Sequence, residues 1–382
     1  MAPAFRYSPA REMPRAPGNP SVCLNMIVKN EAKVIARCLE SVKPLIDAWA
    51  IVDTGSTDGT QAIIRSVMAD IPGELHERPW QNFGHNRSEA IELARGKADY
   101  LFVIDADDVL AIPPRFALPK LTKDAYQVRV EDAGTSYLRI HLFRADLDYR
   151  YVGVLHEVLT SSEKRTMGRI DGLVYKRTGG GARSVSPNKY RNDAAVLEAA
   201  LAAEPANARY AFYLAQSWRD CGELEKAIAA YAHRAQMGGW EEEVYFSLHE
   251  VGRLSARLGK DDGVVMDAFL RAYEQRPTRA EPMCNLAAHL REVGRRNAAY
   301  PFARIAMETP RPEDILFVDD AVYAWRSLDE YAVAAFWVGR YKDALSANQR
   351  LLSSTTLPPN ERERVQKNMG FCREKIGGGK GR

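Results

Sequence analysis

Three aspartates follow a short apolar run in LFVIDADDVL, residues 101–110. Side-chain direction alternates along a strand, so Asp105 and Asp107 would point to the same side and reach one ligand. Carboxylate oxygens suit Mg²⁺ or Mn²⁺, which bind through one or two such groups and share the rest of their shell with water and phosphate. A helix cap or a solvated loop is the alternative, although a cap needs one carboxylate and Asp108 makes three.

Two further stretches carry candidate ligand-binding side chains. Asp53 ends an apolar run in IVDTGSTDGT, where the tight glycine turn lets a ligand approach the backbone and the carboxylate can accept from a base N–H or a ribose hydroxyl. Arg87, in NFGHNRSEA, begins a predicted helix, where a guanidinium can pair with phosphate or stack on a base. The alternatives are a turn with a helix cap for the first stretch and a surface ion pair for the second.

Strand and helix patterns alternate from Ser21 to about residue 110. Apolar runs such as SVCLNMIV, AWAIVD and DYLFVID are separated by stretches with helical spacing, including NEAKVIARCLESVKPL and TQAIIRSVMADI. This alternation predicts an α/β fold with a doubly wound, mostly parallel sheet, in which ligands bind at the carboxyl ends of the strands. Asp53 and Asp105 both stand at such ends. Residues 125–175 read as β segments that complete the sheet or add an antiparallel flap.

After Pro187 the pattern is helical and repetitive. Glycines at 222, 259, 294 and 339 recur at gaps of 37, 35 and 45 residues, each between two helical stretches, as in helical-hairpin repeats. An ordinary helical bundle is the alternative. We therefore predict a flexible leader over 1–20, a ligand-binding domain over 21–177, a glycine-rich linker over 178–187, a helical-repeat domain over 188–376 and a disordered tail over 377–382.

Composition excludes several classes of protein. Lys and Arg total 53 and Asp and Glu total 50, so the net charge of +3 lacks the basic excess of a nucleic-acid binder. The five cysteines are scattered and never form a CxxC pair, which argues against a zinc site and fits a reducing, cytoplasmic location. No apolar run is long enough for a transmembrane helix.

The motifs together resemble a known family. CLNMIVKNEAKVIARCLESV, IVDTGSTDGT and NFGHNRSEAIELARGKADYLFVIDADD, in this order, resemble the nucleotide-sugar domain of family 2 glycosyltransferases, which has the GT-A fold. The resemblance covers roughly residues 20 to 175. LFRADLDYRYVGVLHEVL also resembles a subgroup with a Gly-x-x-His-Glu motif and C-terminal tetratricopeptide-like helices, and the peptide S-glycosyltransferases have a related layout.

The resemblance implies roles for individual residues. Asp53 would contact the uracil or ribose of a UDP-sugar donor, Arg87 would support the nucleotide, and Asp105 would lie near the ribose. Asp107 would hold Mn²⁺ or Mg²⁺ against the diphosphate, and His156 and Glu157 fall where the subgroup has its His-Glu pair. From the residues themselves, His156 could be a further metal or diphosphate ligand, and Asp105 could reach the same metal as Asp107. The family's usual Ala-Arg-Asn stretch has Ser88 in place of its asparagine, which leaves the contact of this helix open.

Glycosyl transfer requires a stabilised diphosphate leaving group and a base for the acceptor hydroxyl. Family 2 enzymes are similar in inverting the anomeric centre in one displacement, so one base is enough. Glu157, next to His156, is the first candidate, and Glu131 and Asp132 are its rivals. A hydrogen-bonding core residue is the alternative role for His156, and a solvated hairpin turn the alternative for the rivals.

The leading functional hypothesis is a metal-dependent hexosyltransferase whose helical domain recruits the acceptor, which is a glycan, a peptide or protein, or a lipid-linked intermediate. A second hypothesis is a degenerate nucleotide-sugar-binding scaffold with a protein-interaction arm. A third is a sugar nucleotidyltransferase, which normally carries a glycine-rich loop after the first strand, whereas KNEAK has no glycine. An oligomer is compatible with each of these hypotheses.

Overall fold

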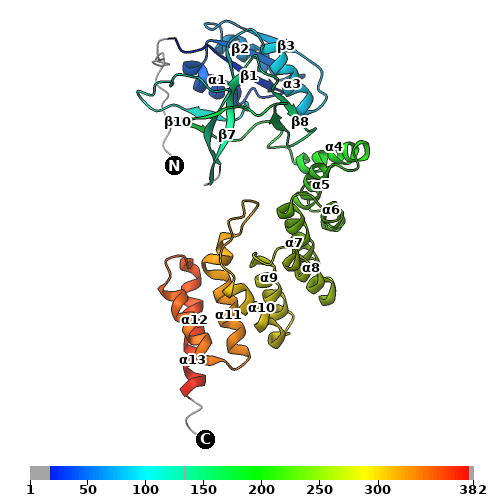
Figure 1. Ribbon diagram of the computed structural model, residues 1–382, viewed down its shortest axis with the longest axis vertical. Coiled ribbons are helices and arrows are strands. Elements are labelled where there is room, and N and C mark those ends of the chain that lie inside the picture. Colours follow the sequence, from blue (N-terminus) through cyan, green and yellow to red (C-terminus); the bar gives the residue numbers. More distant parts are fainter. Residues whose placement is uncertain (1–17, 133–134, 378–382) are drawn as a thin grey trace. The chain divides into compact units, whose positions relative to one another are not determined.

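The computed structural model describes residues 18–132 and 135–377, and the predicted leader and tail lie mainly outside them. The chain divides into two compact units, one ending at Asn192 and the other beginning at Asp193 (Figure 1). Each unit is described by itself below. Within the described residues, no helix is both long enough and apolar enough to cross a bilayer.

Strands and helices alternate through the first unit up to β4, as the sequence predicts. Its elements are β1 (Val22–Val28), α1 (Ile35–Val42), η1 (Lys43–Leu45), β2 (Ala48–Asp53), α2 (Thr60–Val67), β3 (Gly73–Glu77), α3 (Phe83–Ala94), β4 (Tyr100–Val103), β5 (Val109–Ala111), β6 (Ala125–Asp132), β7 (Thr135–Arg144), β8 (Arg150–Val152), β9 (Val158–Thr160) and β10 (Met167–Lys176).

The described residues form an eight-stranded sheet in the order β3-β2-β1-β4-β7-β6-β10-β5. The pairs β1–β2, β2–β3, β1–β4 and β6–β10 are parallel, while β7 runs antiparallel to β4 and β6. Residues 125–175 therefore largely complete the sheet, and β8 and β9 form a separate two-stranded ribbon. The parallel strands β1, β2 and β4 end at one edge, which carries the predicted ligand-binding aspartates.

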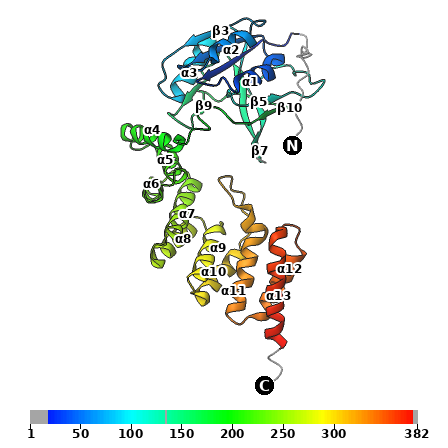
Figure 2. The same cartoon turned by 180° about the vertical axis from the view of Figure 1, so that it is seen from behind.

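Two apolar cores cover the two faces of this sheet, and the helices α1, α2 and α3 that contribute to them are labelled in Figure 2. Alternate residues of β1 point to opposite sides. Leu24 and Met26 join residues of α1 and α2 in one core, and Cys23 joins Ile91 and Ala94 of α3 in the other. Because both faces are covered, the central strands are almost entirely apolar. Asn25, in the middle of β1, is buried and donates to the carbonyls of Ala50 and Ala90.

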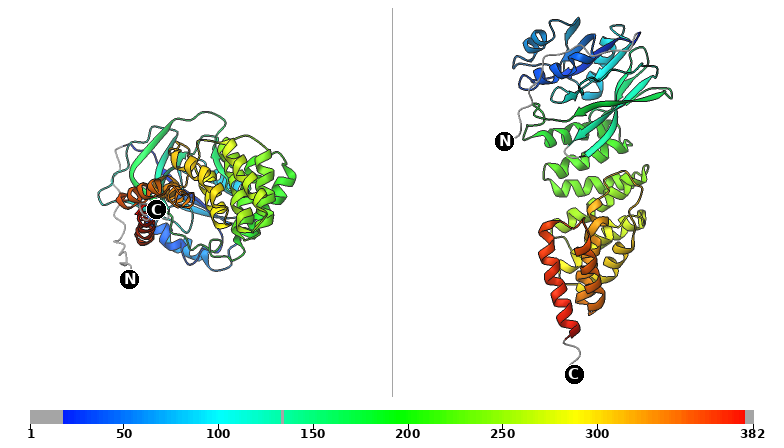
Figure 3. Two further views of the ribbon diagram at one scale, coloured as in Figure 1. Left: turned by 90° about the horizontal axis from the view of Figure 1, so that it is seen from below. Right: turned by 90° about the vertical axis from the view of Figure 1, so that its left-hand side faces the viewer.

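The second unit consists of helices packed as consecutive antiparallel pairs (Figure 3). The predicted fold class, a mostly parallel doubly wound sheet followed by helical repeats, is confirmed. The helices are α4 (Lys189–Ala203), α5 (Ala208–Asp220), α6 (Leu224–Gln236), α7 (Glu241–Arg257), α8 (Asp262–Gln275), α9 (Glu281–Glu292), α10 (Arg296–Glu308), η2 (Val322–Arg326), α11 (Ser327–Trp337), α12 (Tyr341–Ser353), η3 (Pro359–Glu361) and α13 (Arg362–Gly377).

The repeated glycines have one structural role. Gly222, Gly259, Gly294 and Gly339 each have a positive φ, between 64° and 84°, in the turn between the two helices of a pair. Only glycine adopts this conformation without strain, which explains their recurrence. The longer gap before Gly339 corresponds to an extended link over residues 309–321, between α10 and η2.

His249 of α7 is buried in the second unit and needs to be neutral. Its Nε2 lies 2.9 Å from the side-chain nitrogen of Asn285, so Nε2 accepts the amide hydrogen and the proton of the ring is on Nδ1. Burial lowers the pKa of His249 to about 3. The charged side chains that act on this ring are Glu250, Arg253, Arg279 and Arg326.

We predict an acid-dependent loss of stability from His249. The folded-state pKa is below the usual 6.5, so the neutral ring contributes stability above pH 6.5 that is lost as the pH falls toward 3. His249→Gln keeps an acceptor for Asn285 but has no proton to take up. In thermal unfolding between pH 7 and pH 4, the wild type should lose more stability than the variant. Parallel curves would contradict this role.

Candidate functional site

Asp53 ends β2 and organises the turn that follows it. Its Oδ1 accepts hydrogen bonds from the backbone N–H groups of Gly55, at 2.8 Å, and Ser56, at 2.7 Å. Its Oδ2 is buried without a hydrogen-bond partner among the described residues. A buried carboxylate oxygen of this kind is costly unless something donates to it. Asp53 therefore offers an acceptor to a ligand donor such as an N–H or a hydroxyl.

Asp105, Arg87 and Glu157 form a single ion-pair group. The Arg87 guanidinium, on α3, donates a short hydrogen bond to Asp105 Oδ1, and its Nε lies 2.8 Å from Glu157 Oε1. The Arg87 and Glu157 side chains are largely buried. Arg87 thus joins two carboxylates, of which the sequence assigns Asp105 to the nucleotide and Glu157 to base catalysis.

Burial alone would raise the pKa of Asp105, but Arg87 outweighs it and the pKa falls to about 2. The two carboxylates raise the pKa of Arg87 in turn. Asp105 is therefore an ionised carboxylate whose charge is already balanced by Arg87. This pairing makes it a weaker candidate for a metal ligand than its position in the sequence indicates.

Close backbone contacts place Glu157 against α3. Phe83 N donates to the carbonyl of Val154, and a β-carbon at Gly84 would lie 2.3 Å from the carbonyl oxygen of Gly153. Ser88, which replaces the family's asparagine, bonds both the N–H and the carbonyl of Tyr151 through its hydroxyl. The helix that carries Arg87 is therefore fixed directly to the segment that carries the His-Glu pair.

Asp108 has a structural role. It is buried and accepts from the Tyr175 hydroxyl at 2.7 Å and from Thr178 N at 3.0 Å. The same Tyr175 oxygen lies 3.1 Å from Asp105 N, and His141 stacks on the Tyr175 ring with centroids 4.1 Å apart. These contacts join the aspartate loop to β7 and β10, beneath the strand ends.

Asp107 is covered by the glycine-rich segment over residues 178–184. Gly181 N and the Ser184 hydroxyl each lie 3.2 Å from Asp107 Oδ2, and the Thr178 hydroxyl donates to the Asp107 carbonyl at 2.6 Å. Arg183 extends this contact, because its guanidinium lies 4.7 Å from the centre of the Phe83 ring. The segment predicted as a linker thus also folds onto the acidic loop.

Glu31, after β1, is a candidate that the motif-based reasoning missed. Its Oε2 is buried without a hydrogen-bond partner in the described part of the chain. Glu31 Oε2 and Asp107 Oδ2 both lie within 3.0 Å of the position that a β-carbon would take at Gly181. Burial, followed by the charge of Asp107, raises the pKa of Glu31 to about 7. Its place after the first central strand was the available signal, because β1 ends at the same edge as β2.

The remaining candidates are His156, Glu131 and Asp132. His156 is exposed and has a positive φ of 51°. Among the described residues no three His, Cys, Asp or Glu side chains gather as a metal centre, so His156, Asp105 and Asp107 are not preassembled as one. Glu131 pairs with Arg129 at 2.6 Å, and Asp132 pairs with Arg177 at 3.0 Å.

Comparison with known proteins gives a family for part of the first unit. Residues 23–132 match the model of glycosyl transferase family 2. The glycosyltransferase SunS of Bacillus subtilis is 24% identical over 222 residues, which are 55% of this chain and 52% of SunS. The lipopolysaccharide core biosynthesis glycosyltransferase LpsC of Rhizobium meliloti is 34% identical over 97 residues, 25% of this chain and 35% of LpsC.

A TPR repeat-containing protein of Synechococcus elongatus is 35% identical over 149 residues, 37% of this chain and 36% of that protein. The chain thus spans between about a third and about half of the length of these relatives. The family match and the glycosyltransferase relatives define a glycosyltransferase domain. Residues 23–132 belong to glycosyl transferase family 2.

We predict that Arg87 stabilises the first unit strongly. Arg87→Gln would leave the largely buried Glu157 and the 36% exposed Asp105 without their cation; removing the partner of a buried charge typically costs about 3–5 kcal/mol. Chemical denaturation of the full chain measures the loss. Arg78→Gln is the control, since Arg78 pairs with Glu89 at a more exposed site, where about 1 kcal/mol or less is expected. Equal losses in the two variants would show that the Arg87 group is not a stabilising centre.

Proposed function

We propose that this protein is a metal-dependent, inverting glycosyltransferase that uses a UDP-sugar as donor. The observation that carries the proposal is the convergence of Asp53, Glu31 and the Asp105–Asp108 loop on the carboxyl edge of β1, β2 and β4. In open α/β sheets ligands bind at this edge. The buried, unpartnered oxygens of Asp53 and Glu31 support a ligand that brings both donor groups and positive charge.

The carboxylate oxygens of Glu31 and Asp107 are ligands that suit Mg²⁺ or Mn²⁺. Glu31 Oε2 and Asp107 Oδ2 face the same small space at Gly181, and these cations need only one or two protein carboxylates when a diphosphate completes their shell. In this proposal Asp107 and Glu31 hold the cation, and Asp105 stays with Arg87. The bound cation would neutralise the negative charge that develops on the departing diphosphate.

The chain's own groups supply the remaining chemistry. Asp53 Oδ2 accepts a hydrogen bond from the nucleoside and so orients the donor. Glu157 is the proposed base that takes the proton from the acceptor hydroxyl, and its ion pair with Arg87 fixes where it points. Asp132 and Glu131 are the alternatives. A single base is enough for a direct displacement, so no covalent sugar–protein intermediate is needed.

The acceptor is proposed to be a glycan, a peptide or protein, or a lipid-linked intermediate, recruited partly by the helical unit. All five cysteines are free thiols, which supports a reducing, cytoplasmic setting. The same site serves the alternative scaffold function if it binds UDP without turnover. A donor screen that measures UDP release in the presence of Mn²⁺ separates the two.

We predict that Asp107→Asn slows UDP release from the preferred UDP-sugar by at least about 100-fold, because the cation's electrostatic stabilisation is worth several kcal/mol. Asp171→Asn is the matched control, since Asp171 lies on β10 of the same unit and is 78% exposed. Titration calorimetry with UDP, with and without Mn²⁺, should show that only Asp107→Asn loses metal-dependent binding. Release that is unchanged in Asp107→Asn would remove Asp107 from the site.

We further predict that Glu157→Gln retains UDP binding but transfers sugar at least about 100-fold more slowly, as expected for loss of a general base. Calorimetry measures the binding, and UDP release with acceptor measures the transfer. If Glu157→Gln transfers at the wild-type rate while Asp132→Asn does not, the base is Asp132.

A further inference from the structure

The glycine-rich segment over residues 178–184, which we call the strap, is anchored at its start. It follows β10 closely, since that strand ends at Lys176. Thr178 N donates to Asp108 Oδ1 at 3.0 Å, and the Thr178 hydroxyl donates to the Asp107 carbonyl at 2.6 Å. These bonds are made to a main-chain oxygen and to the structural carboxylate, so this part of the strap leaves the side chains of the proposed cation ligands alone.

The rest of the strap covers those side chains. Gly181 N and the Ser184 hydroxyl both donate to Asp107 Oδ2, each at 3.2 Å, and the Ala182 N–H faces the Glu31 carboxylate. Both donors to Asp107 Oδ2 are neutral. Their distances lie at or beyond the upper end of the usual range, which is about 3.2 Å for an N–H donor and about 3.0 Å for a hydroxyl. Asp107 Oδ2 is therefore covered, but by weak bonds.

A bound cation and the closed strap exclude each other. Mg²⁺ prefers six oxygen ligands at about 2.0–2.1 Å, so two carboxylate oxygens leave about four positions for water and a diphosphate. A β-carbon at Gly181 would lie 2.9 Å from Asp107 Oδ2 and 3.0 Å from Glu31 Oε2, so Gly181 caps the space between the two oxygens. The cation can complete its shell only after the Gly181 backbone has moved away.

Two successive glycines join the anchored start of the strap to its covering part. Gly179 and Gly180 have positive φ angles of 64° and 93°, and glycine changes between this conformation and others without a steric penalty. Arg37 of α1 donates to the Gly179 carbonyl at 3.2 Å, which keeps the first glycine in place. Because a few loop residues can absorb the whole backbone change of a hinge, the covering part can turn away while Thr178 stays bonded.

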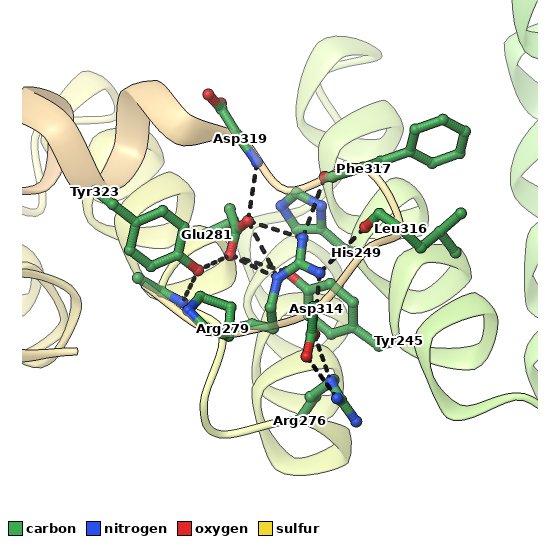
Figure 4. Close-up of polar contacts among 12 residues, drawn as sticks. Tyr245, His249, Arg276, Arg279, Glu281, Asp314, Leu316, Phe317, Asp319 and Tyr323 are labelled. Atoms are coloured by element: carbon green, nitrogen blue, oxygen red, sulfur yellow. Dashed lines mark hydrogen bonds and ion pairs between the residues drawn. The ribbon is translucent and has the colours of Figure 1, made fainter. Parts of the chain in front are cut away.

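A loop of the second unit shows a different way of holding a segment. The extended link over residues 309–321 is fixed by buried charges (Figure 4). Arg279 is 1% exposed and donates to Asp314 and to the Phe317 carbonyl, both at 3.2 Å, and Arg276 donates two bonds of 2.6 Å to the same aspartate. Breaking a buried ion pair of this kind is strongly unfavourable. The strap covers its carboxylates with neutral donors instead, so it detaches more easily.

We propose that the strap closes the cation site until Mn²⁺ or Mg²⁺ displaces it from Asp107 and Glu31. In the closed state Gly181 N and the Ser184 hydroxyl donate to the carboxylate oxygen that the cation needs. In the open state the cation takes their place, and the two strap groups bond water. The inference deepens the proposed function and rests on it for the position of the cation.

Such a strap lowers the apparent affinity of the protein for the cation. Only molecules with an open strap bind it, so the apparent dissociation constant rises as the open fraction falls. Weakening the closed state therefore strengthens cation binding. Losing a group that supports the bound cation would have the opposite effect, so the direction of the change distinguishes a competing strap from a supporting one.

The first test is hydrogen–deuterium exchange of the full-length protein, measured by mass spectrometry with and without saturating MnCl₂. A peptide that covers the strap should exchange at least about threefold faster with Mn²⁺, because Gly181 N loses its acceptor. The extended link over residues 309–321 is the internal control and should not change. Slower or unchanged exchange of the strap would overturn the proposal.

Asp107→Asn identifies the cation that opens the strap. The amide oxygen of this variant can still accept from Gly181 N, but a neutral amide is a much weaker ligand for Mn²⁺ than a carboxylate. Adding Mn²⁺ should therefore leave the exchange of its strap unchanged. An equal response in the variant and the wild type would place the responsible cation elsewhere and refute the proposal.

A matched pair of serine variants tests the competition directly. Ser184→Ala removes one donor to Asp107 Oδ2 and should bind Mn²⁺ at least about twofold more tightly in calorimetry. Ser186→Ala is the control and should bind as the wild type does, since Ser186 bonds Arg183 and Lys189 through its backbone. Weaker or unchanged binding in Ser184→Ala would show that its hydroxyl does not compete with the cation.

These measurements separate the inference from the proposed function, because they need neither donor nor acceptor. A strap that opens with Mn²⁺ in a protein that releases no UDP from any donor would refute the proposed transfer and leave this inference standing. Mn²⁺-dependent UDP release with a strap that stays protected would do the reverse. If no Mn²⁺ binding depends on Asp107, the inference fails together with the proposed cation site.

Discussion

The burial of one guanidinium between two carboxylates governs the first unit. Arg87 balances the charges of Asp105 and Glu157 beneath the strand ends. This ion-pair group determines which acidic side chains remain available to a ligand. Asp105 is already neutralised, so positive charge from a ligand is attracted to Asp107 and Glu31 instead. A structural ion pair thereby decides where a substrate's diphosphate and its cation would be held.

The sequence predicts much of this arrangement and misses a specific part of it. Strand ends, the turn after Asp53 and the glycine turns between helices follow from local spacing, and the structure contains all of them. The pairing of Arg87 with Glu157 does not follow, because these residues are 70 positions apart and no local pattern records such a contact. Glu31 was within reach, since it follows a central strand, but a lone glutamate in KNEAK carries no spacing signal.

Ion pairs between arginines and carboxylates organise the polar side chains of both units. In the first unit, the buried Arg87 balances the charge of Asp105. Asp107 and Glu31 are then the acidic side chains available to a ligand. In the second, Arg253 is more exposed than the Glu250 carboxylate with which it pairs, whereas Arg234 and Arg279 are buried together with their glutamate partners. The extended link over residues 309–321 was visible in the sequence only as the longer gap before Gly339. Its conformation depends on Arg279 and Asp314, which meet through tertiary packing that periodicity does not report.

The contact between Gly84 and Gly153 has a consequence for how this domain can vary. A methyl group at position 84 would overlap the carbonyl oxygen of Gly153. Helix α3 and the segment that carries His156 and Glu157 can therefore pack this closely only because residue 84 has no side chain. A homologue that acquired alanine at position 84 would have to shift the opposing backbone, and with it the residue proposed as base. The two stretches are therefore expected to change in concert, and grafting one without the other between related domains should misalign the acceptor's reactive hydroxyl.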